Sequence, residues 1–195
     1  MRNLLRHMML AAGAVMALAG TMGAIAPAIA AQRMHTVMVG GAAMYPNRNI
    51  VQNAVNSRDH TTLVAAVQAA GLVDTLSGPG PFTVFAPTNA AFAALPAGTV
   101  ETLLRPENRA QLTAVLTYHV VAGRHTAADL MRMIRAGHGM ARLTTVQGGV
   151  LTARMRGRMI VLTDGRGGTA TVTQADVMQS NGVIHVTNAV SLPGA

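Results

Sequence analysis

Residues 80–92 read GPFTVFAPTNAAF, a strand pattern followed at once by a helix pattern. A Gly-Pro pair interrupts the chain, and the four residues that follow are aromatic or β-branched, which favours a short buried strand. We expect Phe82 and Phe85 to anchor a core, each burial contributing about 1.5–3 kcal/mol. Thr88 or Asn89 can then cap a helix. The stretch therefore predicts a strand that runs directly into a helix.

Outside this stretch, helical and strand patterns are segregated along the chain. Apolar residues recur with helical spacing in residues 50–56, 59–71, 72–76, 100–104, 106–117 and 129–134. Beyond residue 140 the apolar period changes from about 3.6 to 2. The expected strands there are residues 143–146, 150–155, 159–163, 169–173 and 183–187. Helices first and strands late indicate an α+β domain with a largely antiparallel sheet.

Residues 1–30 have the pattern of a secretory signal peptide. A positive start and a long uncharged apolar stretch precede Ala28-Ile29-Ala30, which is a small-x-small cleavage pattern. We expect Sec-type export, cleavage after this pattern and a periplasmic or extracellular protein; an uncleaved anchor is the alternative. Residues 31–46 lack periodicity and are expected to form a flexible arm, which leaves one domain over residues 47–193.

The composition excludes several chemistries. The chain of 195 residues contains no Cys, and all 15 basic residues are Arg. Disulfides, thiolate metal sites, Cys nucleophiles and Lys Schiff bases are therefore absent. Without residues 1–30 the chain carries 13 Arg and seven acids, a formal net charge of +6. That charge would attract the protein to anionic surfaces, although colloidal solubility is an alternative explanation.

No catalytic or metal-binding pattern is recognisable. The four Ser residues lie outside any Gly-x-Ser-x-Gly turn, the seven acids are dispersed, and the His residues show no His-Glu-x-x-His run. We therefore expect no enzyme, no metal and no cofactor. Nucleic acid is not expected as a partner, because the few aromatic residues are not interleaved with the Arg residues.

Three segments in order resemble the signatures of the fasciclin domain family. They are residues 80–92, residues 116–123 (LTYHVVAG) and residues 181–193 (NGVIHVTNAVSLP). The resemblance covers residues 47–193 and implies a fasciclin-like β-wedge of two small, largely antiparallel sheets with an N-terminal helical layer. It also implies a secreted or surface protein that mediates adhesion to matrix components, polysaccharides or other cells.

The central signature contains Tyr118 and His119, and the family resemblance links this Tyr-His segment with receptor adhesion. If the segment is extended, the two side chains point to opposite faces, so one should be buried and the other should lie nearer the surface. The alternative is a structural histidine that fastens a helix to the sheet through hydrogen bonds. Both remain open.

A second candidate for partner binding is the alternating set Arg154, Arg156 and Arg158. On an extended chain these three would project from one side, joined by Arg142 and Arg166, and could hold sulfate, carboxylate or phosphate groups. The alternative is that they are charges that protect an exposed sheet edge.

Together these patterns predict an exported, non-enzymatic adhesion module that contacts protein or anionic polysaccharide at the cell surface. We expect a monomer that meets the membrane only through an uncleaved signal segment. One alternative is a periplasmic small-ligand or lipid binder, which needs an apolar pocket. A weaker alternative is a hydrolase with an unrecognised site.

Overall fold

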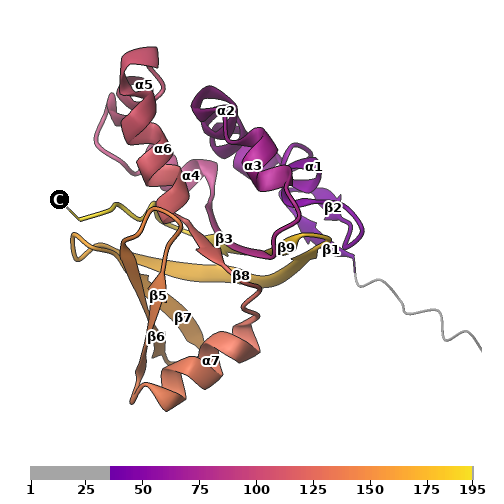
Figure 1. Cartoon of the computed structure of the whole chain (residues 1–195), viewed down its shortest axis with the longest axis vertical. Coiled ribbons are helices and arrows are strands. Elements are labelled where there is room, and N and C mark those ends of the chain that lie inside the picture. Colours follow the sequence, from indigo (N-terminus) through magenta and orange to yellow (C-terminus); the bar gives the residue numbers. More distant parts are fainter. Residues whose placement is uncertain (1–35, 195) are drawn as a thin grey trace, which may run out of the picture. The chain divides into compact units, whose positions relative to one another are not determined.

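Nine strands form two sheets in the computed structural model, which describes residues 36–194 (Figure 1). The predicted signal peptide lies outside these residues. A hairpin consists of β1 (Val37–Val39) and β2 (Ala42–Met44). The larger sheet has the strand order β4-β3-β9-β8-β7-β6-β5. Its strands are β3 (Phe82–Pro87), β4 (Val120–Ala122), β5 (Met140–Thr144), β6 (Val150–Arg156), β7 (Met159–Thr163), β8 (Thr169–Gln179) and β9 (Gly182–Thr187).

The prediction of two small sheets is wrong, because β8 joins both halves into one seven-stranded mixed sheet. Its first residues pair with β7, and the residues from Val172 onward pair with β9. The pattern predicted an end at residue 173, but a bulge around Asp176, whose φ is 58°, carries the strand on to Gln179. β3 and β9 are parallel, and the other neighbouring pairs of this sheet are antiparallel. A single bridge, Val121–Thr145, connects the two outer strands.

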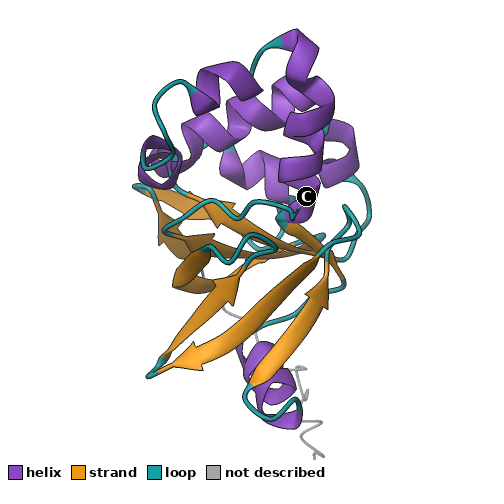
Figure 2. Ribbon diagram, turned by 90° about the vertical axis from the view of Figure 1, so that its left-hand side faces the viewer, coloured by secondary structure: helices purple, strands orange, loops and turns teal. Residues whose placement is uncertain are grey.

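Of the seven α-helices within residues 36–194, six cover one side of the larger sheet and one lies on the other side (Figures 1 and 2). The covering helices are α1 (Ile50–Ala54), α2 (Thr61–Ala70), α3 (Val73–Ser77), α4 (Asn89–Ala93), α5 (Thr99–Leu103) and α6 (Arg109–Tyr118), with 3-10 turns at Arg58–His60 and Pro106–Asn108. The separate helix is α7 (Ala127–Ala136), which packs against β5 and β6. Local signals explain the helix ends, because Asn49 and Thr88 cap α1 and α4 and Gly71 ends α2 with a φ of 71°.

Two apolar clusters fill the spaces above and below the strands. Val84, Ala86, Ile184 and Val186 belong to the cluster under the helical layer. Phe85 belongs to the second cluster, which α7 closes on the opposite side. Ile184 and Val186 face the cluster under the helical layer, and all six residues of β9 are buried because both faces of the strand are covered. Phe85 is fully buried as predicted, whereas Phe82 is only partly buried.

Part of the predicted flexible arm belongs to the folded unit. Residues 37–44 form the β1–β2 hairpin, with Gly40 and Gly41 at positive φ in its turn. Val39 and Met44 are buried in the cluster under the helices. Strands of three residues are too short to show a period, which is why the sequence pattern missed them. Within residues 36–194, no helix combines the length and apolar character needed to cross a membrane.

Candidate functional site

Tyr118 is a buried residue at the end of α6, where it connects three segments. The residue is 1% exposed. The hydroxyl donates a hydrogen bond to the Val150 carbonyl at 2.7 Å and accepts one from the Gly165 N–H at 2.8 Å. Burial raises the pKa of the Tyr118 hydroxyl, and the Gly165 N–H opposes that shift. The side chain therefore ties α6 to β6 and to the β7–β8 turn.

His119 follows Tyr118 with helical backbone angles and is also buried. Its Nδ1 donates to the Val115 carbonyl at 2.8 Å, and its Nε2 accepts from the Ser191 N–H at 2.9 Å. These two partners require the neutral ring with the proton on Nδ1. Burial lowers the pKa of His119, with opposing effects from the Val115 carbonyl and Asp164.

The expectation that Tyr118 or His119 lies nearer the surface is therefore wrong. The segment is the end of a helix rather than a strand, so the two side chains do not alternate between faces. The hydrogen bonds of His119 hold α6 to the C-terminal segment. A direct contact of either side chain with a receptor stays a prediction, and it would require this part of the domain to open.

His185 is a third buried histidine, and its contacts are structural. Its Nε2 donates to the His125 carbonyl at 2.8 Å, and its Nδ1 accepts from the Asp176 N–H at 3.3 Å. The ring stacks on Phe85, with 5.6 Å between the ring centres. Burial lowers the pKa of His185, although the His125 carbonyl and Asp176 raise it in part. Both nitrogens are occupied, so the ring has no free position for catalysis.

The predicted Arg set is mostly brought together, and we call Arg142, Arg154, Arg156 and Arg158 the Arg face. Arg154 and Arg156 lie two residues apart on one face of β6, and Arg142 lies on the same face of β5, opposite Thr152. Arg158 lies in the adjoining turn between β6 and β7. All four are exposed, and none of their side chains makes an ion pair or a hydrogen bond within residues 36–194.

Arg166 does not join this face. It lies in the turn after β7, at the end of that strand away from Arg158, and its Nε donates to the Pro193 carbonyl at 2.9 Å. Two exposed methionines flank the Arg face instead, since Met140 is opposite Arg154 and Met159 is opposite Arg156.

The charge of the described chain is strongly divided. Residues 130–163, which include most of α7 and all of β5, β6 and β7, contain six Arg and no acid. The other described residues contain six Arg and all seven acids. The net positive charge therefore belongs to one part of the folded unit, and the Arg face is its exposed sheet surface.

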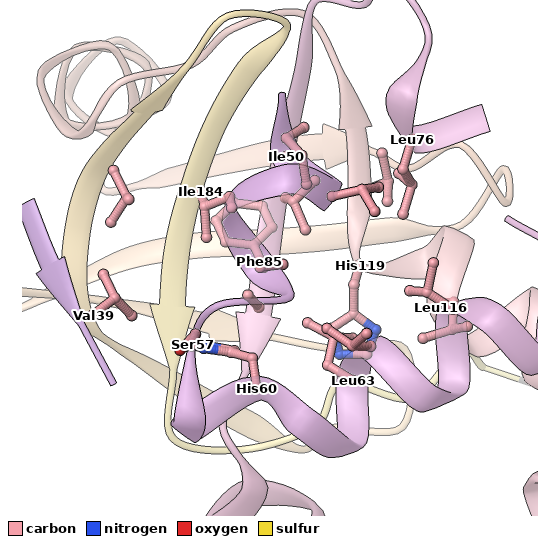
Figure 3. A pocket seen from close by; sticks show the side chains of 18 of the residues that line it. Val39, Ile50, Ser57, His60, Leu63, Leu76, Phe85, Leu116, His119 and Ile184 are labelled. Carbon is pink, nitrogen blue, oxygen red and sulfur yellow. Dashed lines mark hydrogen bonds between the residues drawn. The ribbon is translucent and has the colours of Figure 1, made fainter. Parts of the chain in front are cut away.

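A second candidate site is an apolar cavity between the helical layer and the sheet (Figure 3). Its volume is about 80 Å³. Ile50, Leu63, Val84, Leu116 and Ile184 are among the buried side chains that line it. Apolar spacing could predict that such residues meet in a core, but a cavity depends on how distant segments pack.

His60 is the polar feature of this cavity that sequence reasoning missed. It is 3% exposed, and its Nδ1 lies 2.8 Å from the Ser57 hydroxyl. Its Nε2 is buried and has no hydrogen-bond partner within residues 36–194. Burial lowers the pKa of His60, and the nearby Ala86 carbonyl and Asp59 oppose the shift. The only sequence signal is the Ser57-x-x-His60 spacing, which by itself is not specific.

Metal binding finds no support in the described residues, because no three His, Asp or Glu side chains gather there in a way that could hold an ion.

Comparisons with known proteins agree with the fold. The model of the fasciclin domain matches residues 58–193. Protein sll1483 of Synechocystis sp. (strain PCC 6803) is 46% identical over 171 residues, covering 86% of this chain and 88% of that protein. Immunogenic protein MPT70 of Mycobacterium tuberculosis is 36% identical over 147 residues, covering 73% of this chain and 67% of that protein.

A solved structure shares the architecture at low sequence identity. It is a FAS1 domain pair from the insect cell adhesion molecule fasciclin I, with a TM-score of 0.67 and 15% identity, covering 80% of this chain and 57% of that one. The family match spans more than half of the chain, and the two bacterial relatives align over most of their own length. The strand order, the buried Tyr-His segment and these matches lead to one conclusion: the chain belongs to the fasciclin domain family.

Proposed function

We propose that this protein is an exported, non-enzymatic interaction module that attaches to anionic polysaccharide at a cell surface through the Arg face. The observation that carries the proposal is the charge division, with six Arg and no acid in residues 130–163. The family supports the general class of function, because the related domain pair comes from a cell adhesion molecule. The occupied nitrogens of His119 and His185 are consistent with a structural rather than a catalytic use of these rings.

The spacing of the Arg face suits repeated anionic groups. Arg154 and Arg156 are about 7 Å apart along the strand, and Arg142 is a diagonal neighbour of Arg154 at a similar distance. A guanidinium group can bind a carboxylate or a sulfate through two parallel hydrogen bonds. Since none of these Arg residues is paired with an acid of the described chain, a polyanion can bind without displacing an internal ion pair.

Protection of a sheet edge does not explain the position of Arg154 and Arg156. β6 lies between β5 and β7, and both neighbours pair with it. Its backbone groups are therefore satisfied by the sheet, and there is no edge for these charges to protect. Their side chains occupy an open face of the sheet, where binding is the better explanation.

The test compares two triple variants that lose the same number of charges. Arg154→Gln/Arg156→Gln/Arg158→Gln removes most of the Arg face, and Arg48→Gln/Arg58→Gln/Arg105→Gln removes three exposed Arg residues elsewhere. Both proteins are eluted with a salt gradient from a column carrying a sulfated polysaccharide and from one carrying a neutral polysaccharide. We expect the first variant to elute at clearly lower salt than the second, because only it loses adjacent contacts.

Two results would contradict the proposal. Equal elution of both variants would mean that net charge alone determines retention. Retention of the unchanged protein on the neutral column at the same salt would mean that the partner is not recognised by its charge.

A further inference from the structure

We propose that the cavity between the helical layer and the sheet binds a small, uncharged, apolar molecule that carries one oxygen atom, with His60 Nε2 as the hydrogen-bond donor to that oxygen. This site is separate from the Arg face. It rests on three observations: the walls of the cavity, the unpartnered nitrogen of His60, and the position of the residues through which the cavity is reached.

The walls define an apolar space larger than an ordinary packing defect. Close-packed interiors leave few voids that exceed one water molecule, and a water needs about 10–15 Å³ on this scale. A volume of about 80 Å³ is therefore room for roughly five to eight non-hydrogen atoms. Such a space lined by aliphatic side chains stays dry unless an apolar molecule enters it.

Among the described residues, His60 Nε2 is the buried polar side-chain atom of the lining that has no hydrogen-bond partner, whereas the polar lining residue Gln68 is exposed. Ser57 and His119 also line the cavity, but Ser57 is occupied by His60, and both nitrogens of His119 have backbone partners. When the Ser57 hydroxyl donates to His60 Nδ1, the ring proton resides on Nε2. The Ala86 carbonyl lies near the ring, yet it makes no hydrogen bond that satisfies Nε2. A buried donor without an acceptor is costly, so an oxygen in the cavity is stabilised there.

The chemistry of the walls limits the ligand class further. A carboxylate in the cavity would be buried among aliphatic groups, and the neutral His60 ring would give it no charged partner. The free-energy cost of burying that charge exceeds the gain from one hydrogen bond. An alcohol or a ketone pays no such penalty. The expected ligand is therefore neutral, with a compact hydrocarbon body and one hydroxyl or carbonyl oxygen.

The access route lies among three short helices. The lining residues that are not fully buried all come from α1, α2 and α3, whereas the lining residues from the strands and from α6 are buried. α1 and α3 are only five residues long, and the exposed part of the cavity lining lies on them and on α2. A ligand can therefore enter beside these helices without disturbing the sheet. The partly or fully exposed lining residues are Val51, Ala54, Val64, Gln68 and Val73.

The experiment uses cyclohexanone as the probe, with cyclohexane and hexanoate for comparison. Each compound is titrated into the full chain labelled with ¹⁵N, and the changes in amide chemical shift give the affinity. We expect cyclohexanone to bind saturably, with shifts at the lining residues, and hexanoate not to bind. His60→Phe should weaken the affinity for cyclohexanone about fivefold to tenfold, which is the effect of one hydrogen bond. The affinity for cyclohexane should not change.

A filling variant and a matched control locate the site. Val64→Phe places a larger side chain in the cavity and should abolish binding, while Ala69→Phe adds the same ring at an exposed position of α2 and should not. Ala54→Leu fills the cavity from α1 if Val64→Phe does not fold. Absence of saturable cyclohexanone shifts would overturn the proposal, and so would binding that survives both filling variants. If His60→Phe weakens the binding of cyclohexanone and of cyclohexane equally, then Nε2 does not donate a hydrogen bond to the ligand.

Discussion

The side chain of Asn181 accepts a hydrogen bond from the backbone N–H of Ile50, the first residue of α1, across 131 positions of the chain. The same side chain donates to the carbonyls of Leu76 and Gly78 at 2.8 Å each. One amide therefore joins the start of α1, the end of α3 and the turn between β8 and β9. Because these backbone groups are buried or partly buried, the amide replaces water that cannot reach them.

Asn181→Ala should destabilise the domain by about 3 kcal/mol or more, because three backbone groups lose their partner at once. The free energy of unfolding in urea measures the effect. Asn56→Ala is the control, since its side chain makes one exposed hydrogen bond to Gln52 and should change stability by less than about 0.5 kcal/mol. A loss at Asn181 no larger than that at Asn56 would show that water satisfies the three groups equally well.

Tyr118→Phe should lower stability by about 1–2 kcal/mol, because the Val150 carbonyl and the Gly165 N–H lose the hydroxyl between them. Tyr45→Phe is a matched control, as Tyr45 is the other tyrosine of the chain and is exposed. Thermal unfolding of both variants provides the comparison. If Tyr118 is structural, its variant still elutes from the sulfated column at the salt concentration of the unchanged protein; a change there at unchanged stability would indicate a binding role.

Local signals predicted most elements of the fold, whereas the pairing of strands depended on distant residues. Thr88 was identifiable as a possible cap because a cap needs only the residues of its own first turn. The parallel pairing of β3 with β9 joins residues 100 positions apart, such as Phe82 and Gly182, and no local pattern indicates it. The bulge at Asp176 likewise hid the length of β8, since it breaks the alternation by which strands are recognised.

The candidate sites divide in the same way. Spacing alone predicted that Arg154 and Arg156 share one face, because side chains on a strand repeat every two residues. It could not place Arg158 or Arg166, whose positions depend on turns. His60 was not identified at all, since the cavity walls around it come from segments far apart in the chain.

Residues 1–30 are expected to be removed on export, so the mature protein should begin at Ala31. N-terminal sequencing of the protein recovered from the periplasm or the medium checks this. Ala30→Asp should block cleavage, because the peptidase requires a small neutral residue there, while Ala31→Ser should be processed normally. A mature protein that still carries residues 1–30 and remains with the membrane would support the uncleaved anchor instead.

Lowering the pH from 8 to 5 should reduce the free energy of unfolding, because burial lowers the pKa values of His60, His119 and His185 in the folded state. Above about pH 6.5 these rings are neutral in both states and have no effect on the equilibrium. As the pH falls below that value, the unfolded chain binds protons more readily than the folded one, so stability is lost until the folded pKa values are passed. The carboxyl pKa of Asp129 is also lowered, by its hydrogen bonds to Thr126, but Asp129 titrates below this range. Urea unfolding at several pH values measures the slope. A stability that stays flat between pH 8 and 5 would show that the three rings are not held neutral by burial.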